Sequence, residues 1–304
     1  MSSDTVSDPG APGSQPAAPQ VTAEVLTQAL PYIQRFAGRT VVIKFGGVPV
    51  GDPAVANAIA GDIVLMHSVG IRPVIVHGGG PQIDDLMGRL DKEPSFVAGR
   101  RVTDAETLDI VRMVLVGKVN RDIVSSINAH TPLAVGVSGE DAGLIRAVPR
   151  DPALGFVGEV GEVAPGIVRN LQELGYIPVV STIGADAAAQ AYNINSDTVA
   201  GALAAALEAE RLVVLTDVAG LLADVDDPAS VLSEVTASDL AGILAADGVA
   251  GGMIPKVEAC LQAVRNGVGS AHLLDGTRPH MLLLELFTDA GVGTMIRPDP
   301  QEMS

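Results

Sequence analysis

Two lysines in this sequence lie where a cation is unfavourable unless an anion lies beside it. Lys44 belongs to the apolar run at residues 41–45 and is followed by Gly46 and Gly47. Burying an ammonium group without an anionic partner is costly, and the two glycines allow backbone N–H groups to approach a ligand closely. Lys256 falls in the first turn of a predicted helix, where a cation opposes the helix dipole by about 0.3–1 kcal/mol. A phosphate group would offset both costs, whereas the alternatives are a Lys44 side chain that extends past the sheet edge and an exposed Lys256.

A second glycine run, at residues 78–80, follows the apolar run 73–77 and precedes Pro81. Proline suits the first position of a helix, so this run opens onto a helix N-terminus, where free N–H groups and the dipole attract an anion. The alternative is a simple glycine turn, and the absence of a following Gly-Lys-Ser or Gly-Lys-Thr excludes a Walker loop. His77 is expected to end a strand rather than to bind a ligand, because the histidines show no metal-ligand spacing.

Asp197 lies in the first turn of another predicted helix, after the N-cap candidates Asn195 and Ser196. The helix dipole alone explains an aspartate at this place, but an aspartate between two ammonium groups would also hold them apart and aligned. No Ser–His–Asp or Cys–His set suggests covalent catalysis. Two lysines, two glycine runs and an aspartate therefore suit phosphoryl transfer, which depends on positioning and on charge neutralisation.

The elements that must position these residues are short apolar runs, which alternate with longer amphipathic segments. This alternation predicts a mainly parallel sheet covered by helices on both faces, a three-layer αβα sandwich. Such sheets bind ligands outside the carboxyl ends of their strands. The predicted strands are 41–45, 73–77, 133–137, 177–181, 212–216 and 271–274, and the predicted helices are 54–69, 81–90, 105–129, 196–209 and 255–266.

Composition and charge exclude several classes of function. The chain has 304 residues, of which 47% are hydrophobic, enough for a large core in two domains or two lobes. It carries 36 acidic against 19 basic residues and only 3% aromatic residues, so we expect no nucleic-acid partner. No apolar run is long enough for a membrane helix, and the first basic residue is Arg35, so the charged start of a signal peptide is missing. The single cysteine, Cys260, is expected in the core, and the whole pattern predicts a cytoplasmic protein.

The N-terminal region has two parts. Residues 1–20 are rich in proline and serine and are predicted to be a disordered tail. Apolar residues at helical spacing follow Thr22, the predicted N-cap. Pro31 lies inside this pattern and is expected to kink or split the helix. A helix ahead of the first core strand would either cap the fold or reach a neighbouring subunit.

In this order the motifs resemble the amino acid kinase family, and within it the kinases that phosphorylate N-acetyl-L-glutamate. The resemblance runs from about residue 26 to residue 297, and no single glycine motif would carry it alone. One departure is Val48-Pro49-Val50, where many members have Asn-Ala-Met, and Pro49 is expected to stiffen a loop that closes over the substrate. The matching segments are VVIKFGG (41–47), PVIVHGGGPQID (73–84), GRRVTD (99–104), IPVVSTIG (177–184), NINSDTVA (193–200), LTDVAGLL (215–222), GGMIPKVEACLQAV (251–264) and LLLELFTDAGVGTMI (282–296).

The resemblance implies ATP-dependent phosphorylation of the side-chain carboxylate of N-acetyl-L-glutamate, the second step of arginine biosynthesis. Lys44 and Lys256 would stabilise the transferring phosphoryl group, Asp197 would orient both lysines, and Mg²⁺ would travel with ATP without a protein ligand. The implied substrate contacts are Gly79, Gly80, Arg101 and Asn193. The implied nucleotide or phosphate contacts are Gly46, Gly47, Asp217, Gly220, Leu221 and Met253.

The resemblance also implies an organisation and a regulation. An N-terminal lobe, residues 38–209, would bind N-acetyl-L-glutamate, and a C-terminal lobe, residues 210–298, would bind ATP. The segment 21–37 resembles a kinked helix that joins dimers into a hexamer in arginine-inhibited members, so we expect a homo-oligomer, either this trimer of dimers or a dimer. An allosteric L-arginine pocket would include His272, Glu285 and Gly291.

Three questions stay open at this point. Another amino acid kinase, acting on aspartate, glutamate or carbamate, would share the phosphoryl-transfer residues. A catalytically silent arginine or nucleotide sensor is the alternative from another class, and the intact set of Lys44, Asp197 and Lys256 speaks against it. Some relatives bind a PII-type nitrogen-signalling protein, and the sequence does not decide whether this chain does.

Overall fold

The computed structural model describes residues 19–46, 53–97, 99–224, 227, 230–246, 248–289 and 291–300. Gly47, the Val48-Pro49-Val50 segment and residues 1–18 of the predicted tail lie outside the described residues. Among the helices of the described ranges, none is both long and apolar enough to cross a membrane.

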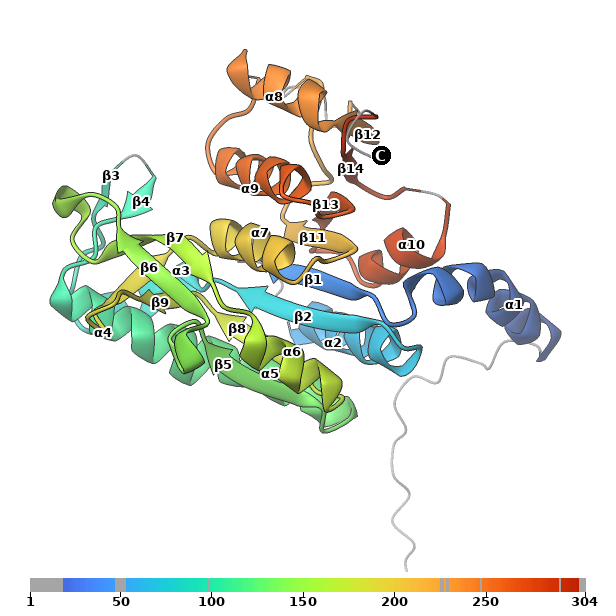
Figure 1. Ribbon diagram of the computed structural model, residues 1–304, viewed down its shortest axis with the longest axis horizontal. Coiled ribbons are helices and arrows are strands. Elements are labelled where there is room, and N and C mark those ends of the chain that lie inside the picture. The colour runs from blue at the N-terminus through green and yellow to red at the C-terminus, as the bar shows by residue number, and fades with distance from the viewer. Residues whose placement is uncertain are drawn as a thin grey trace, which may run out of the picture.

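The centre of the molecule is an eight-stranded sheet in the order β12-β14-β13-β11-β1-β2-β8-β5 (Figure 1). Every neighbouring pair is parallel except β13 and β14, so the predicted mainly parallel sheet is confirmed. The strands are β1 Thr40–Phe45, β2 Arg72–His77, β5 Ala134–Ser138, β8 Ile177–Ser181, β11 Arg211–Thr216, β12 Glu234–Thr236, β13 Ser270–Asp275 and β14 Thr294–Arg297.

Helices cover both faces of this sheet, because side chains alternate between the two faces along each strand. In β1, Val41 and Ile43 pack in one hydrophobic cluster with α2, α5 and α10, whereas Val42 packs in a second cluster with α6, α7, α8 and α9. The helices are α1 Pro19–Phe36, α2 Pro53–Ser68, α3 Gly80–Arg89, α4 Ala105–Arg112, α5 Asn120–His130, α6 Gly166–Glu173, α7 Ser196–Ala206, α8 Ala237–Ala245, α9 Met253–Arg265 and α10 Met281–Phe287. The three-layer αβα sandwich is therefore confirmed.

A small closed barrel adjoins the carboxyl ends of β5 and β8, since its strands follow those ends directly in the chain. It consists of β6 Ile145–Pro149, β7 Val157–Val163, β9 Ile183–Ala185 and β10 Ala191–Ile194. A two-stranded hairpin, β3 Phe96–Val97 and β4 Arg100–Arg101, lies near the barrel (Figure 1). Neither the barrel nor the hairpin is predicted from the sequence.

The predicted strands and helices are found with their ends within three residues, except for one helix and the N-terminal region. The segment 105–129 is not one α-helix, because a π-helix, Met113–Val119, separates α4 from α5. α1 begins at Pro19, where proline is favourable, so the predicted N-cap at Thr22 and the predicted disorder of residues 19 and 20 are wrong. Pro31 lies within α1 and does not split it.

Candidate active site

The two lysines meet at one carboxylate. Lys44 is the fifth residue of β1, lies between β2 and β11, and is only 3% exposed. Its Nζ lies 2.7 Å from Oδ1 of Asp197, and Nζ of Lys256 lies 3.4 Å from Oδ2 of the same residue. Lys44 therefore has the anionic partner that its burial demands. Burial, and to a lesser degree the charge of Lys256, lowers the pKa of Lys44, although Asp197 opposes this shift.

Asp197 is held by the start of α7. The side chain of Asn195, the N-cap, accepts hydrogen bonds from the backbone N–H groups of Asp197 at 2.8 Å and Thr198 at 3.1 Å. α7 and α9 approach so closely that a Cβ on Gly201 would lie 2.9 Å from the carbonyl oxygen of Ala259. This contact brings Lys256, in the first turns of α9, toward Asp197.

Cys260 confirms the prediction of a core residue. It is fully buried on α9, and burial raises the pKa of its thiol. A thiol that is hard to ionise is a poor nucleophile, which agrees with the absence of a Cys–His set from the sequence motifs.

Gly46 and the second glycine run lie at strand ends, Gly46 against backbone and the second run against side chains. The N–H of Gly46 donates to the carbonyl oxygen of Leu215 at 3.2 Å, and a Cβ on Gly46 would lie 2.6 Å from that oxygen. A Cβ on Gly78 would lie 2.9 Å from Oγ of Ser196, so the second glycine run touches the start of α7. Gly46, the second glycine run and the carboxylate that joins the lysines thus lie at the carboxyl edge of β1 and β2.

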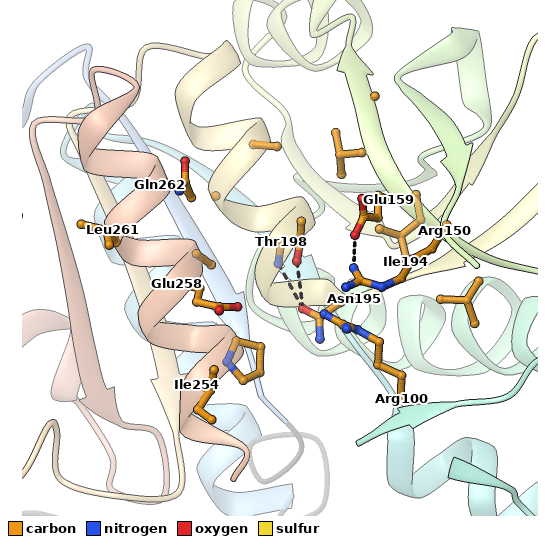
Figure 2. Close-up of a pocket in the computed structure, with 18 of the residues that line it drawn as sticks. Arg100, Arg150, Glu159, Ile194, Asn195, Thr198, Ile254, Glu258, Leu261 and Gln262 are labelled. Carbon is orange, nitrogen blue, oxygen red and sulfur yellow. Dashed lines mark hydrogen bonds and ion pairs between the residues drawn. The ribbon is translucent and has the colours of Figure 1, made fainter. Parts of the chain in front are cut away.

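A large open cleft of about 1350 Å³ lies beside this group of charges. It is bordered by α7 and α9 on one side and by the barrel and the β3–β4 hairpin on the other (Figure 2). Asn195 and Thr198 line it near Asp197, and Arg100 and Arg150 extend toward it from the opposite side, where Arg150 is ion-paired with Glu159.

Two of the predicted substrate contacts line the cleft. Arg101 is buried, with Nη1 2.6 Å from Oδ1 of Asp84, and its guanidinium lies 4.8 Å from the ring centroid of Phe96. Asn193 Nδ2 donates to Oγ1 of Thr103 at 3.4 Å. Both side chains are therefore oriented by polar contacts at the cleft wall.

The predicted nucleotide contacts lie on the loops after β11 and before α9. Asp217 is exposed directly after β11, and Met253 begins α9. Gly220 leads into Leu221, whose side chain is in the core and whose N–H donates to Oγ1 of Thr294 at 2.8 Å. Leu232 N–H donates to the Leu221 carbonyl, so the backbone of Leu221 also holds this loop together.

The three residues of the predicted arginine pocket also lie near one another. His272 on β13 is fully buried, with Nδ1 2.7 Å from Oε1 of Glu285 on α10. Glu285 Oε2 accepts from the backbone N–H of Val292 at 3.1 Å, next to Gly291. Burial opposes ionisation of Glu285, but the hydrogen bond from His272 and its other polar contacts give it a lowered pKa.

Sequence reasoning missed two charged residues at these sites. Asp84, which is ion-paired with Arg101, lies one turn into α3. An acidic residue soon after a glycine run was the sequence signal that could have identified it. Arg211 begins β11, lies 4.6 Å from the ring centroid of Phe36 and donates to the Glu285 carbonyl at 3.4 Å. A buried arginine at the start of a strand has no local sequence signature.

Within the described ranges, no group of three or more His, Cys, Asp or Glu side chains is placed to hold a metal ion. The positive charge beside Asp197 is that of Lys44 and Lys256.

Comparison with known proteins places this geometry in a family. The model of the amino acid kinase family matches residues 39–275. The chain is 54% identical over 290 residues to acetylglutamate kinase from Acidothermus cellulolyticus, covering 92% of this chain and 97% of that protein. It is 51% identical over 274 residues to acetylglutamate kinase from Acaryochloris marina, covering 90% of this chain and 96% of that protein.

Solved structures share the fold. N-acetylglutamate synthase from Neisseria gonorrhoeae, complexed with coenzyme A and L-arginine, has a TM-score of 0.76 and 25% identity, over 90% of this chain and 65% of that one. The present chain thus spans about two thirds of the synthase. Carbamate kinase from Giardia lamblia bound to AMP-PNP has a TM-score of 0.66 and 20% identity, over 87% of this chain and 100% of that one.

Proposed function

The chain belongs to the amino acid kinase family, and we propose that it transfers the γ-phosphoryl group of ATP to the side-chain carboxylate of N-acetyl-L-glutamate. The product is N-acetyl-L-glutamyl 5-phosphate, and the reaction is the second step of arginine biosynthesis. The observation that carries the proposal is the pair of lysines on Asp197 at the carboxyl edge of β1. The acetylglutamate kinase relatives, at 50% identity or more over about 90% of the chain, support the choice of substrate.

The chemistry needs no protein nucleophile. An ionised carboxylate oxygen of the substrate attacks the γ-phosphorus, the bond from that phosphorus to the β–γ bridging oxygen breaks, and ADP leaves. Lys44 and Lys256 neutralise the charge on the transferring group from opposite sides. Asp197 holds both ammonium groups in position, and the N–H groups around Gly47 and Gly79 would hold the transferring oxygens, since the Gly46 N–H is bonded to the Leu215 carbonyl.

The two substrates occupy the two lobes. Residues 38–209 bind N-acetyl-L-glutamate through Gly79, Gly80, Arg101 and Asn193, with the guanidinium of Arg101 on the α-carboxylate. Residues 210–298 bind ATP through the loops that carry Asp217, Gly220 and Met253. This arrangement would bring the two anions to the lysine pair from the two sides of the cleft.

Mg²⁺ accompanies ATP in this proposal. When bound, it neutralises phosphate charge and holds the phosphates in one conformation. In the proposal the nucleotide phosphates are its ligands. The chain's own contribution is the charge of Lys44 and Lys256.

The regulatory proposal rests on the C-terminal cluster and on α1. Free L-arginine binds beside Glu285, His272 and Gly291. Its two cationic groups, the guanidinium and the α-ammonium, suit a buried carboxylate whose pKa is lowered. Exposed Val25 and Leu26 on α1 would pack on a neighbouring subunit, in a hexamer of three dimers or in a dimer. L-arginine is also named in the complex of the synthase with the same fold.

One assay tests the activity and the regulation together. Acyl-phosphate formation is trapped as the hydroxamate with N-acetyl-L-glutamate, glutamate, aspartate or carbamate, with and without arginine. Turnover restricted to N-acetyl-L-glutamate supports the proposed reaction, and turnover only on another acid replaces the substrate. An absence of turnover on all four acids favours a sensor. Light scattering that shows only dimers, together with no effect of arginine, would contradict the regulatory proposal.

A further inference from the structure

Two buried polar side chains that the proposed reaction does not use lie directly behind the second glycine run. His77, the last residue of β2, is 0% exposed, and Asn120, the first residue of α5, is 1% exposed. A buried polar side chain is costly unless it is hydrogen-bonded. The partners of these two side chains therefore indicate what they stabilise.

The hydrogen bonds of His77 fix its tautomer. Nδ1 lies 2.9 Å from the carbonyl oxygen of Gly78, and a carbonyl can only accept, so Nδ1 carries the proton. Burial lowers the pKa of His77 to about 4, which keeps the ring neutral at physiological pH. Nε2 therefore has a free lone pair, and it accepts a hydrogen bond from Nδ2 of Asn120 at 3.1 Å.

Asn120 is itself held in one orientation. Its Nδ2 also donates to the carbonyl oxygen of Val179 in β8 at 2.8 Å, and its Oδ1 accepts from Arg121. Both hydrogens of the amide group are thus used, one toward His77 and one toward β8. The chain of contacts runs from the backbone of β8 through Asn120 and His77 to the carbonyl of Gly78.

The π-helix Met113–Val119 places Asn120 there. The Asn120 N–H donates to the carbonyl of Leu115, five residues earlier, which closes the wide turn. The same helix packs on the glycine run, since a Cβ on Gly79 would lie 2.7 Å from Cδ2 of Leu115 and 3.1 Å from Cγ2 of Val119. Leu115, Val119 and Asn120 therefore all support the run from behind.

The contact with Gly78 orients a second group. The carbonyl of Gly78 and the N–H of Gly79 belong to one planar peptide unit, and in a trans unit they point in opposite directions. The structure has no cis peptide bond in its described residues. Between two glycines, whose backbone angles are otherwise free, a hydrogen bond from His77 to the Gly78 carbonyl fixes the direction of the Gly79 N–H.

We propose that His77 and Asn120 are positioning residues, which hold the Gly78–Gly79 peptide so that the Gly79 N–H faces the transferring phosphoryl group. The inference rests on the proposed function, in which this N–H is a donor to that group. A donor that is already oriented needs no reorganisation during the reaction. The two residues act through the peptide and touch neither substrate.

Two substitutions of His77 separate the two ends of the imidazole. His77→Asn retains a donor near the position of Nδ1 and so retains the bond to the Gly78 carbonyl, but it loses the contact with Asn120. His77→Gln places its amide near the position of Nε2, so it retains the contact with Asn120 and loses the bond to Gly78. Asn120→Ala removes the support of the ring. Asn128→Ala is the matched control, because Asn128 is on the same helix and bonds the backbone of Ala134, away from the glycine run.

The expected result is a loss of kcat that follows the bond to Gly78. His77→Gln should lower kcat by roughly 10- to 100-fold, as misplaced catalytic groups do, with a small change in KM for ATP, and Asn120→Ala, which keeps the bond to Gly78 but removes the support of the ring, should lower kcat by less than His77→Gln. His77→Asn should stay within a few-fold of the wild type, and Asn128→Ala should lower only the midpoint of thermal unfolding. Equal losses of kcat in both His77 variants, or unchanged kcat in all of them, would overturn the proposal.

A readout besides activity separates this inference from the proposed function. The ¹⁵N–¹H resonance of Gly79 and its amide exchange rate should change in His77→Gln and should stay near the wild type in His77→Asn. If the wild type does not phosphorylate N-acetyl-L-glutamate, the proposed function fails, and this resonance still decides the positioning role. Equal changes in the two variants would refute that role. If Asn120→Ala does not fold, Asn120→Ser, which keeps a hydroxyl in the space, replaces it.

Discussion

Nζ of Lys44 lies 2.7 Å from Oδ1 of Asp197, and both side chains are almost completely removed from solvent. A buried ion pair is weak support for stability, since the desolvation of two charges offsets much of their attraction. Here the carboxylate is also shared with Lys256 at 3.4 Å, so two cations lie around one anion at the edge of the sheet. An excess of positive charge at this place suits an anionic ligand.

The first prediction concerns this charge. Lys44→Ala should lower kcat by about 10²–10³-fold, the usual effect of losing one donor to a developing charge, while the fold remains. Steady-state kinetics and circular dichroism measure both quantities. Lys118→Ala is the control, because Lys118 is an exposed lysine whose pair with Asp122 should contribute little. A Lys44→Ala enzyme with near-normal turnover would remove Lys44 from the mechanism.

The second prediction is a pH dependence. Burial, opposed by Asp197, lowers the pKa of Lys44 from the ordinary value of 10.5, and only the protonated form can neutralise a phosphoryl group. The alkaline fall of kcat should therefore lie below pH 10.5. In Lys44→Arg the guanidinium stays charged, so the residual activity should lose this fall. An unchanged alkaline limb in Lys44→Arg would assign it to another group.

The strands and helices that meet at the lysines could be predicted from the sequence, because their runs are long and apolar. Val41 to Phe45 around Lys44 is buried on both faces, and such runs have a clear pattern. β7 could not be predicted in this way, because in its sequence VGEVGEV Glu159, Gly161 and Glu162 are exposed, so the apolar run is interrupted. Lys44, Asp197 and Lys256 could be found from local rules, whereas the substrate and nucleotide contacts follow only from the resemblance, and neither source predicts the distances between these residues.

The third prediction tests a helix cap near the substrate side. Asp104 Oδ1 accepts from the Thr107 N–H at 2.7 Å at the start of α4. Asp104→Ala should reduce the free energy of unfolding by about 0.5–2 kcal/mol, whereas Asp104→Asn retains a capping oxygen and should lose less. Urea denaturation at pH 7 measures the difference. Equal stability of the wild type and Asp104→Ala would show that the cap contributes nothing.

The contribution of Asp104 to stability depends on pH. Hydrogen bonds from Thr107 and from Lys92 lower the pKa of Asp104 to about 2. A carboxyl group with a lowered pKa stabilises the fold above its unfolded pKa of about 3.9, and this contribution is lost as the pH falls toward the folded value. The difference in the free energy of unfolding between the wild type and Asp104→Ala should therefore become smaller as the pH is lowered from about 4 toward 2.

The fourth prediction compares the effect of alanine at two neighbouring glycines, Gly79 and Gly80, on the stability of the protein. A methyl group on Gly79 would lie 2.7 Å from Cδ2 of Leu115, whereas one on Gly80 would meet nothing within 4 Å. Gly79→Ala should lower the free energy of unfolding by about 1–3 kcal/mol, as overpacking does, and Gly80→Ala should change it by less than about 0.5 kcal/mol. Urea denaturation of both variants checks this. Equal stability would mean that the π-helix yields to the added methyl group.

That π-helix also marks where prediction from sequence fails. The segment 105–129 has the periodicity of an α-helix, and the insertion of one wide turn at Met113–Val119 leaves no distinct pattern. Its Leu115 and Val119 contact the glycine run, and Asn120, which directly follows it, contacts the His77 side chain. α10, with the sequence MLLLELF, has apolar residues on nearly every side and so gives no period from which to predict it.

The last prediction concerns recognition of N-acetyl-L-glutamate. Arg101 is held by Asp84 at 2.6 Å and by stacking near Phe96, so its planar fork is already oriented at the cleft wall. Lysine in its place would keep one positive charge but would lose the fork and the stacking. Charged hydrogen bonds contribute about 1.5–3 kcal/mol, so Arg101→Lys should raise KM for N-acetyl-L-glutamate by roughly 10- to 100-fold.

The other kinetic constants show whether that loss is specific. KM for ATP should stay near the wild-type value, because Arg101 lies on the N-acetyl-L-glutamate side of the cleft in the proposed arrangement. Arg112→Lys is the matched control, since Arg112 forms an exposed ion pair with Glu140 at 2.9 Å and has no proposed ligand. A rise in KM for both substrates would indicate a distorted cleft. An unchanged KM for N-acetyl-L-glutamate would place its α-carboxylate on another group, for which Arg100 and Arg150 at the same cleft are the nearest candidates.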